Sequence, residues 1–226
     1  ITNRLVGSEM CIRDSVFIVR RERNASALDE LCNEIESSGG NATAIPTDAR
    51  DEEQVINLFS KISEHGQIDC VIFNIGANVF FPIKETTARV FKKVWEMATF
   101  AGFLVGRESA KHMKNNGTII FTGATASVRG SSGFSAFSSA KFGLRALAQS
   151  LARELGPQGI HVVHTIIDGA IDHPWIEENF PETYKLKEVD GILNPDQIAE
   201  TYYNLHLQEK SVWTHEIDLR PYMEKF

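Results

Sequence analysis

Several side chains able to do acid–base chemistry gather around two predicted strands. Asp168, Asp172 and His173 follow the apolar run 160–167, and together they could form an acid/base group. Lys141 lies on the predicted helix before that run, with Phe137 four residues earlier on the same helix face. For the two aspartates and the histidine, a structural role in caps and loop hydrogen bonds is the favoured alternative.

These residues belong to a predicted strand–helix–strand unit. The short apolar run 118–122 predicts a buried strand, and the loop 123–132 that follows is rich in Gly and Ser. Apolar residues at spacings of three and four then predict a helix that ends at Gly156-Pro157. The run 160–167 predicts a second strand, parallel to the first. Parallel sheets of this kind bind ligands at the C-terminal ends of their strands, where the candidate residues stand.

The segment 118–175 resembles the short-chain dehydrogenase/reductase family. Members of that family have Tyr-x-x-x-Lys on this helix and a Ser thirteen residues before the Tyr. Here the motif reads Phe137-Ser138-Ser139-Ala140-Lys141, Ala124 stands at the Ser position, and Ala98 stands where the family has an Asn. The resemblance implies that Lys141 holds the nicotinamide ribose. The Tyr position, Phe137, has neither a proton to give nor an oxygen to accept one.

Two functions remain open, because Lys141 alone keeps its family residue among the four catalytic positions. The first is an NAD(P)-dependent oxidoreductase with a degenerate active site, acting on an unknown carbonyl or alcohol. Its substitute proton donor would be Ser127, Ser138 or His173. The second is a non-catalytic cofactor-binding or scaffold protein that retains the fold.

The resemblance also implies cofactor contacts spread along the chain. Arg20, Arg21 and Arg23 follow a predicted strand at 16–19, where the family's basic residues bind the 2′-phosphate of NADP. A solvated charge cluster is the alternative, but no acidic residue stands at the strand end, so NADP(H) is favoured over NAD(H). The other expected contacts are Asp48 and Ala49 beside the adenine, Asn74 and Gly76 in Asn-Ile-Gly-Ala after the strand 69–73, Lys141, and Gly169 and Ile171 at the nicotinamide.

The first fifteen residues, ITNRLVGSEMCIRDS, do not continue the family pattern. The family opens with a strand and a Gly-x-x-x-Gly-x-Gly turn that places the pyrophosphate at a helix N-terminus, but this segment has one glycine, Gly7. The piece VGSEMCIRDS resembles translated sequencing adaptor, and an ordinary mobile N-terminus is the alternative. We therefore expect residues 1–15 to be non-native or disordered. Either a gap or a poorly paired makeshift strand should lie between strands 16–19 and 69–73, and NADP should bind weakly.

Composition is consistent with one domain, residues 16–226. A chain of 226 residues that is 42% hydrophobic fits a Rossmann-like α/β fold, a doubly wound parallel sheet with helices on both faces but without its first strand and glycine-rich turn. The net charge of -7 argues against nucleic-acid binding, no apolar run is long enough for a membrane span, and the three cysteines have no metal-site spacing. We expect a cytoplasmic protein acting on a small molecule, and by family resemblance a homodimer or homotetramer. The remaining predicted elements are helices at 27–38, 55–62, 87–113 and 195–205 and strands at 42–46 and 212–218.

Overall fold

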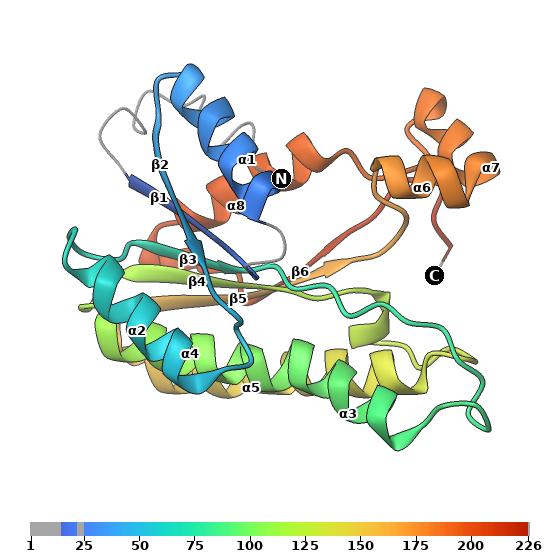
Figure 1. The fold of residues 1–226 in the computed structure, drawn as a ribbon, viewed down its shortest axis with the longest axis horizontal. Coiled ribbons are helices and arrows are strands. Elements are labelled where there is room, and N and C mark those ends of the chain that lie inside the picture. The colour runs from blue at the N-terminus through green and yellow to red at the C-terminus, as the bar shows by residue number, and fades with distance from the viewer. Residues whose placement is uncertain (1–14, 22–24, 226) are drawn as a thin grey trace.

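The computed structural model describes residues 15–21 and 25–225, and its strands and helices alternate along much of the chain (Figure 1). The strands are β1 (Ser15–Arg20), β2 (Asn41–Pro46), β3 (Cys70–Phe73), β4 (Gly117–Thr122), β5 (Ile160–Ile167) and β6 (Glu216–Leu219). The helices are α1 (Ala25–Ser37), α2 (Glu52–Ser63), α3 (Ala88–Trp95), α4 (Ala101–His112), α5 (Ser135–Leu155), α6 (Pro174–Asn179), α7 (Pro181–Tyr184) and α8 (Pro195–His206).

The strands form two parallel sheets. One sheet contains β1 and β2, and the other has the order β3-β4-β5-β6. Figure 1 shows α2, α3, α4 and α5 on one face of the larger sheet, with α8 on the other. Helices on both faces follow from the connections, because a crossover between parallel strands must pass over one face of the sheet. The predicted fold class is confirmed.

No strand lies between β1 and β3 within residues 15–21 and 25–225, and the two sheets share no ladder there. This agrees with the prediction that this part of the chain lacks the family's first strand. The predicted non-native segment falls on residues 1–14, outside the described residues, apart from Ser15. That residue is the first of β1, so the strand begins one position earlier than expected.

The main core lies between the larger sheet and the layer formed by α2, α4 and α5. Phe121, Leu104 and Leu144 are fully buried there. Glycine allows α4 to approach α5 closely, because a Cβ on Gly102 would lie 2.5 Å from the Cδ1 of Leu144. This packing fixes α5, and with it the side chains of the candidate site, against the strands.

Two predicted elements differ in detail. The long helix expected at 87–113 is continuous, but a π-helical turn, Glu96–Phe100, lies between α3 and α4. The last strand begins at Glu216 rather than at 212. Trp213 stacks on the ring of His161 at a centroid distance of 4.8 Å, and the Thr214 amide donates to the side chain of Gln208. These contacts hold the preceding segment off the β5 ladder.

Candidate active site

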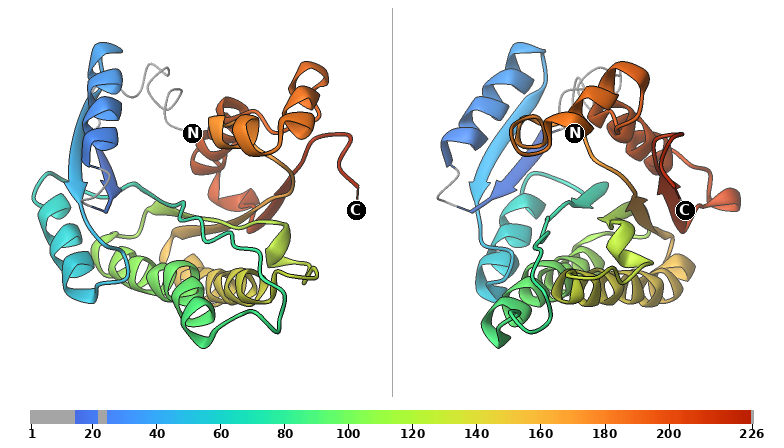
Figure 2. Two further views of the ribbon diagram at one scale, coloured as in Figure 1. Left: turned by 45° about the vertical axis from the view of Figure 1, so that its right-hand side comes forward. Right: turned by 90° about the vertical axis from the view of Figure 1, so that its right-hand side faces the viewer.

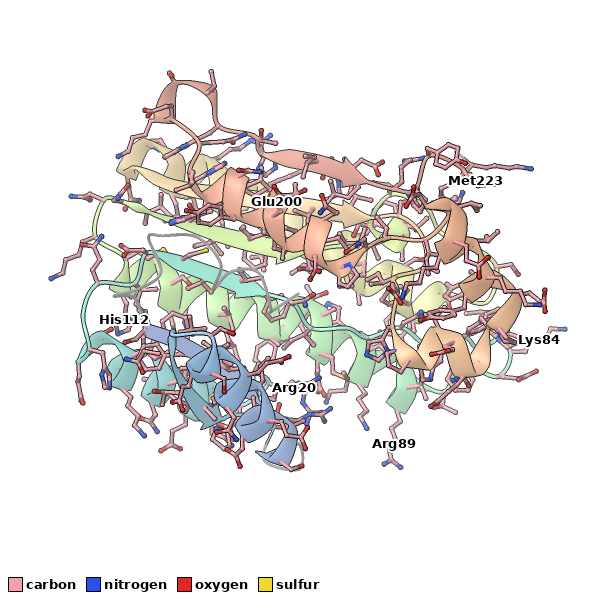
Figure 3. All side chains as sticks on the ribbon, turned by 90° about the horizontal axis from the view of Figure 1, so that it is seen from above. Arg20, Lys84, Arg89, His112, Glu200 and Met223 are labelled. Carbon is pink, nitrogen blue, oxygen red and sulfur yellow. The ribbon has the colours of Figure 1, made fainter. Side chains whose placement is uncertain are left out.

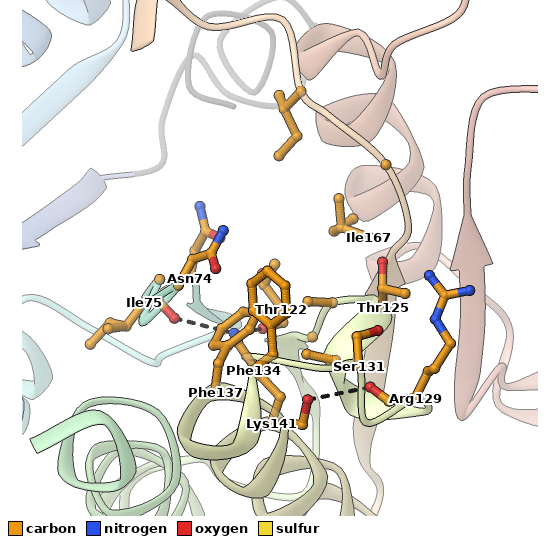
Figure 4. A pocket seen from close by; sticks show the side chains of 18 residues that line it. Asn74, Ile75, Thr122, Thr125, Arg129, Ser131, Phe134, Phe137, Lys141 and Ile167 are labelled. Atoms are coloured by element: carbon orange, nitrogen blue, oxygen red, sulfur yellow. Dashed lines mark hydrogen bonds between the residues drawn. The ribbon is translucent and has the colours of Figure 1, made fainter. Parts of the chain in front are cut away.

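A cavity of about 400 Å³ opens at the C-terminal ends of the central strands (Figure 4). This is the edge at which parallel sheets bind ligands, and the volume is typical of a small-molecule site. The residues that line it come from four segments: Asn74, Ile75, Gly76 and Asn78 after β3; Thr122, Gly123, Ala124, Thr125, Ala126, Arg129, Ser131 and Phe134 from the last residue of β4 onward; Phe137, Ser138 and Lys141 on α5; and Ile167, Gly169 and Ile171 from the last residue of β5 onward.

Lys141 reaches the floor of this cavity from α5 and is only 3% exposed. Its ammonium donates to the carbonyls of Thr122 at 2.8 Å and Ile75 at 3.3 Å. Burial disfavours the charged form and lowers the pKa of Lys141 to about 8. The Phe137 ring centroid lies 5.9 Å from Nζ, as their positions on one helix face require. A lysine in this state can give up a proton much more readily than one in water.

The three residues expected at the family's Tyr, Ser and Asn positions come together in one apolar cluster. Phe137 and Ala98 are buried members of the cluster, and Ala124 packs against them. None of these three side chains carries a proton donor. The proton-bearing groups of the cavity are supplied by other lining residues.

The three candidate substitute donors have different environments. Ser138 lines the cavity, and its Oγ donates to the Arg129 carbonyl at 3.3 Å. Ser127 is fully buried, accepts from the Ala124 amide at 3.1 Å and is not among the lining residues. His173 is exposed and caps α6, with Nδ1 accepting from the backbone amide two residues on. Ser138 is therefore the one candidate of the three that the structure places at the cavity.

The acid/base group considered for Asp168, Asp172 and His173 does not form. Asp168 is buried, accepts from the Thr125 hydroxyl and pairs with Arg220 at 3.1 Å. Asp172 instead pairs with a lysine 15 positions further along the chain, at 2.7 Å. With His173 acting as a cap, all three residues take structural roles. Caps and loop hydrogen bonds are therefore the correct interpretation.

The expected cofactor contacts divide into two groups. Asn74, Gly76, Gly169 and Ile171 line the cavity together with Lys141. The second group lies at the ends of β1 and β2, outside the cavity lining, and contains Arg20, Arg21, Asp48 and Ala49. Figure 3 shows Arg20 beside the smaller sheet and α1. Arg23 falls outside the described residues.

The second group has its own electrostatics. The side chain of Arg50 donates to Asp48 at 2.9 Å and, as the main cause, lowers the pKa of Asp48 to about 2. The charge of Arg21 adds to this lowering, so Arg21 and Asp48 lie within electrostatic reach of one another. Basic and acidic groups thus meet at the C-terminal ends of β1 and β2.

Two buried networks that sequence reasoning missed support the strands beneath Lys141. The Tyr202 hydroxyl bonds those of Thr122 at 2.9 Å and Thr165 at 2.6 Å, which ties β4 and β5 to α8. His164 is fully buried on β5, and its Nδ1 lies 2.9 Å from Glu216, a carboxylate also held by an arginine of α5. Burial lowers the pKa of His164 to about 4. These partners are 37 to 80 residues apart, so no local pattern indicates them.

The part of the chain that the structure describes contains neither a metal-binding cluster nor a membrane-spanning helix. No group of three His, Cys, Asp or Glu side chains is arranged there to hold a metal ion. No helix in that part of the chain is both long and apolar enough to cross a membrane.

Comparison with known proteins identifies the family of this chain. The sequence profile of short chain dehydrogenases matches residues 7–182. The chain belongs to this family. It is 31% identical over 161 residues to a versicolorin reductase of Emericella nidulans, a match that covers 70% of this chain and 61% of that protein. It is 28% identical to a probable tetrahydroxynaphthalene reductase of Zymoseptoria tritici, with 89% of this chain and 77% of the relative covered.

A solved short-chain dehydrogenase from Rhodopseudomonas palustris shares the fold of this chain. Its TM-score is 0.78 at 46% sequence identity, and the match covers 98% of this chain and 95% of the other. The chain thus spans nearly all of that structure, but only 61% of the length of the versicolorin reductase.

Proposed function

We propose that this chain is an NAD(P)(H)-dependent oxidoreductase of a carbonyl or alcohol substrate, with NADP(H) preferred and Lys141 as the proton donor. The observation that carries the proposal is the position of Lys141, which is buried on the floor of the cavity at the C-terminal ends of the strands. Among the lining residues, only Lys141 and Arg129 carry an ionisable group. An arginine does not release its proton in proteins, so Lys141 is the acid.

The described residues fit the two ends of a dinucleotide. The backbone around Gly169 and Ile171, with Lys141, would hold the nicotinamide ribose, and Arg21 and Asp48 would face the adenosine. When bound, the cofactor supplies or accepts a hydride. The sequence has one glycine before Gly39, so a glycine-rich turn for the pyrophosphate is missing from this chain.

Lys141 can position the reacting oxygen as well as protonate it. An ammonium group has three donors, and two of them are directed to the Thr122 and Ile75 carbonyls. The third remains for a substrate oxygen in the cavity. The Phe137 ring centroid lies 5.9 Å from the ammonium, and burial keeps the pKa of Lys141 low.

A non-catalytic role as a cofactor-binding or scaffold protein is the second candidate. The observation that favours it is the apolar cluster at the Tyr, Ser and Asn positions, where Phe137, Ala124 and Ala98 leave no substitute donor. Loss of a positioned acid/base group typically costs about two to four decades of rate. The two candidates differ in turnover, but both predict a ligand in the same cavity.

The test combines binding and turnover in the chain as it stands. Reduced nicotinamide mononucleotide is the binding probe, because it needs neither the pyrophosphate turn nor the adenosine contacts. We expect it to bind, and we expect NADPH-dependent reduction of at least one member of a panel of ketones and quinones. The rate should fall as pH rises through about 8, where Lys141 loses its proton. Lys141→Met should abolish turnover, whereas Ser139→Ala, an exposed change on the same helix, should not. Binding without turnover would favour the non-catalytic role.

Restoring the family's groups should increase the activity. We expect Phe137→Tyr with Ala124→Ser to raise carbonyl reduction by roughly a hundredfold, because the phenol supplies a proton donor beside the Lys141 ammonium. Turnover that stays unchanged across the panel would show that the cavity does not hold a carbonyl productively.

We further propose that the protein acts on a small molecule as a homodimer or homotetramer. The support is membership of the family alone. Light scattering after gel filtration measures the assembly, and a monomer at micromolar concentration would contradict this part of the proposal.

A further inference from the structure

One side of the cavity carries a cation that the proposed reaction does not use. Arg129 lines the cavity from the turn after β4. Figure 4 shows Arg129 and Thr125 across the cavity from Asn74. Within the described part of the chain, the Arg129 guanidinium has no carboxylate partner, whereas the guanidinium groups of Arg145 and Arg220 both pair with acids.

The charge of the cavity is one-sided. Lys141 and Arg129 line it, and no Asp or Glu does, although the whole chain has a net charge of -7. The two acids next in sequence to lining residues are already paired: Asp168 accepts from the Thr125 hydroxyl and pairs with Arg220, and Asp172 pairs with a lysine at 2.7 Å. A concave site with unbalanced positive charge attracts anions.

The cofactor's 2′-phosphate does not account for Arg129. The residues expected to meet that phosphate, Arg20 and Arg21, lie at the end of β1 in the smaller sheet, on the β3 side of the larger sheet (Figure 2). Arg129 follows β4 and lies across the cavity from Asn74, the residue after β3 (Figure 4). The anion that Arg129 would meet therefore belongs to the substrate.

Aromatic side chains form the wall of the cavity beside Lys141 (Figure 4). The ring centroids of Phe134 and Phe137 lie 6.5 Å apart, and Phe80 packs edge-on against Phe134 at 5.2 Å. Such a wall suits a flat ring, because aromatic pairs stack or meet edge to face at these distances. The backbone of Arg129 is held at both ends: its amide donates to the Thr125 carbonyl at 3.0 Å, and its own carbonyl accepts from a serine of α5.

We propose that the cavity takes an aromatic ketone bearing a carboxylate, with the ring against Phe134 and Phe137, the ketone oxygen at Lys141 and the carboxylate on Arg129. The guanidinium fork matches a carboxylate through two parallel hydrogen bonds. The ketone's role rests on the proposed function, but the contact between anion and arginine does not require turnover. Binding and reduction can therefore be tested separately.

The matched probes are 4-acetylbenzoate and 4-acetylbenzamide, which share the ring and ketone and differ in charge. Calorimetric titration of the purified chain at low salt should show the acid binding roughly five- to tenfold more tightly. Added salt should reduce this ratio. Arg129→Met should abolish the preference, Arg129→Lys should keep part of it, and Arg89→Met should retain it, because Arg89 is exposed at the start of α3 (Figure 3).

Each outcome bears on one proposal or the other. Equal binding of the two probes, binding of neither, or a preference that survives Arg129→Met would overturn the role of Arg129. A preference for the acid without NADPH oxidation would support that role while the oxidoreductase proposal fails. Equally efficient reduction of both probes would support the oxidoreductase and reject the carboxylate contact.

Discussion

The two sheets are made of similarly apolar strands but differ sharply in burial. Every residue of β4 and β5 is buried, whereas no residue of β1 is. β4 has a strand on each side, while β1 pairs only with β2 among the described residues (Figure 2). Parallel strands need cover on both edges and both faces to become core. Burial here follows from a strand's neighbours rather than from its own sequence.

The residues of the proposed cofactor site are divided between the same two sheets. Lys141 and the cavity belong to the larger sheet, whereas Arg21 and Asp48 belong to the smaller one. Contacts between the halves include Val19 and Ile45, which pack against the main core, and Phe17, whose ring centroid lies 5.2 Å from that of His65. In the proposed binding mode, the nicotinamide end would rest on the main core and the adenosine end on a smaller cluster.

The largest expected effect compares one strand residue from each sheet. Phe121→Ala should lower the free energy of unfolding by about 3–5 kcal/mol, because Phe121 is fully buried in the main core. Ile18→Ala should change it by less than about 1 kcal/mol, because Ile18 is only half-buried in β1. Urea unfolding followed by tryptophan fluorescence measures the free energy of unfolding of the larger half, because Trp95, Trp175 and Trp213 all lie there. If Ile18→Ala shifts the transition as far as Phe121→Ala, the halves unfold as one unit.

Lowering the pH should have an effect of intermediate size on the free energy of unfolding. Burial lowers the pKa of His164 to about 4, against about 6.5 in an unfolded chain. Above pH about 6.5 the His164 ring is neutral in both the folded and the unfolded state, so its full contribution to the free energy of unfolding is present. As the pH falls towards 4, the unfolded chain binds a proton before the folded chain does, and stability is lost. We expect wild type to lose about 3 kcal/mol more than His164→Gln over this range.

Control variants and hydrogen exchange locate this acid effect. His65→Gln, an exposed change at the end of α2, should follow the wild-type acid profile. Exchange should accelerate first in β5 and β6, the strands that His164 and Glu216 join. Identical acid profiles for wild type and His164→Gln would show that the burial of His164 does not destabilise its charged form.

The smallest expected effect separates the two ends of the cofactor site. Arg21→Ala should weaken NADPH binding by about fivefold, the size of one exposed charge contact. Binding of NADH and of reduced nicotinamide mononucleotide should not change, because neither carries a 2′-phosphate. Fluorescence titration of the three ligands measures this, with Arg89→Ala as the control. An equal loss for NADPH and NADH would assign Arg21 to a role other than recognition of the 2′-phosphate.

The sequence predicted the elements around the site well because their signals are local. The apolar run of β4, the spacing along α5 and the run of β5 each lie within one segment. Placing Phe137 beside Lys141 requires only the geometry of a helix. The choice among Ser127, Ser138 and His173 could not be made this way. In the structure, the Ser127 hydroxyl accepts a hydrogen bond from the Ala124 amide, and His173 caps the N-terminus of α6. These contacts occupy both side chains.

The sequence by itself determined the order of the elements and the residue types at positions 98, 124 and 137. Only the tertiary structure decided that Asp168 is neutralised by Arg220, that Arg129 reaches the cavity and that Lys141 is buried deeply enough to lower its pKa. Residue identity and short-range periodicity are properties of a segment. Burial, ladder partners and charge pairs depend on residues far apart in the chain, so they exist only once the strands and helices have packed.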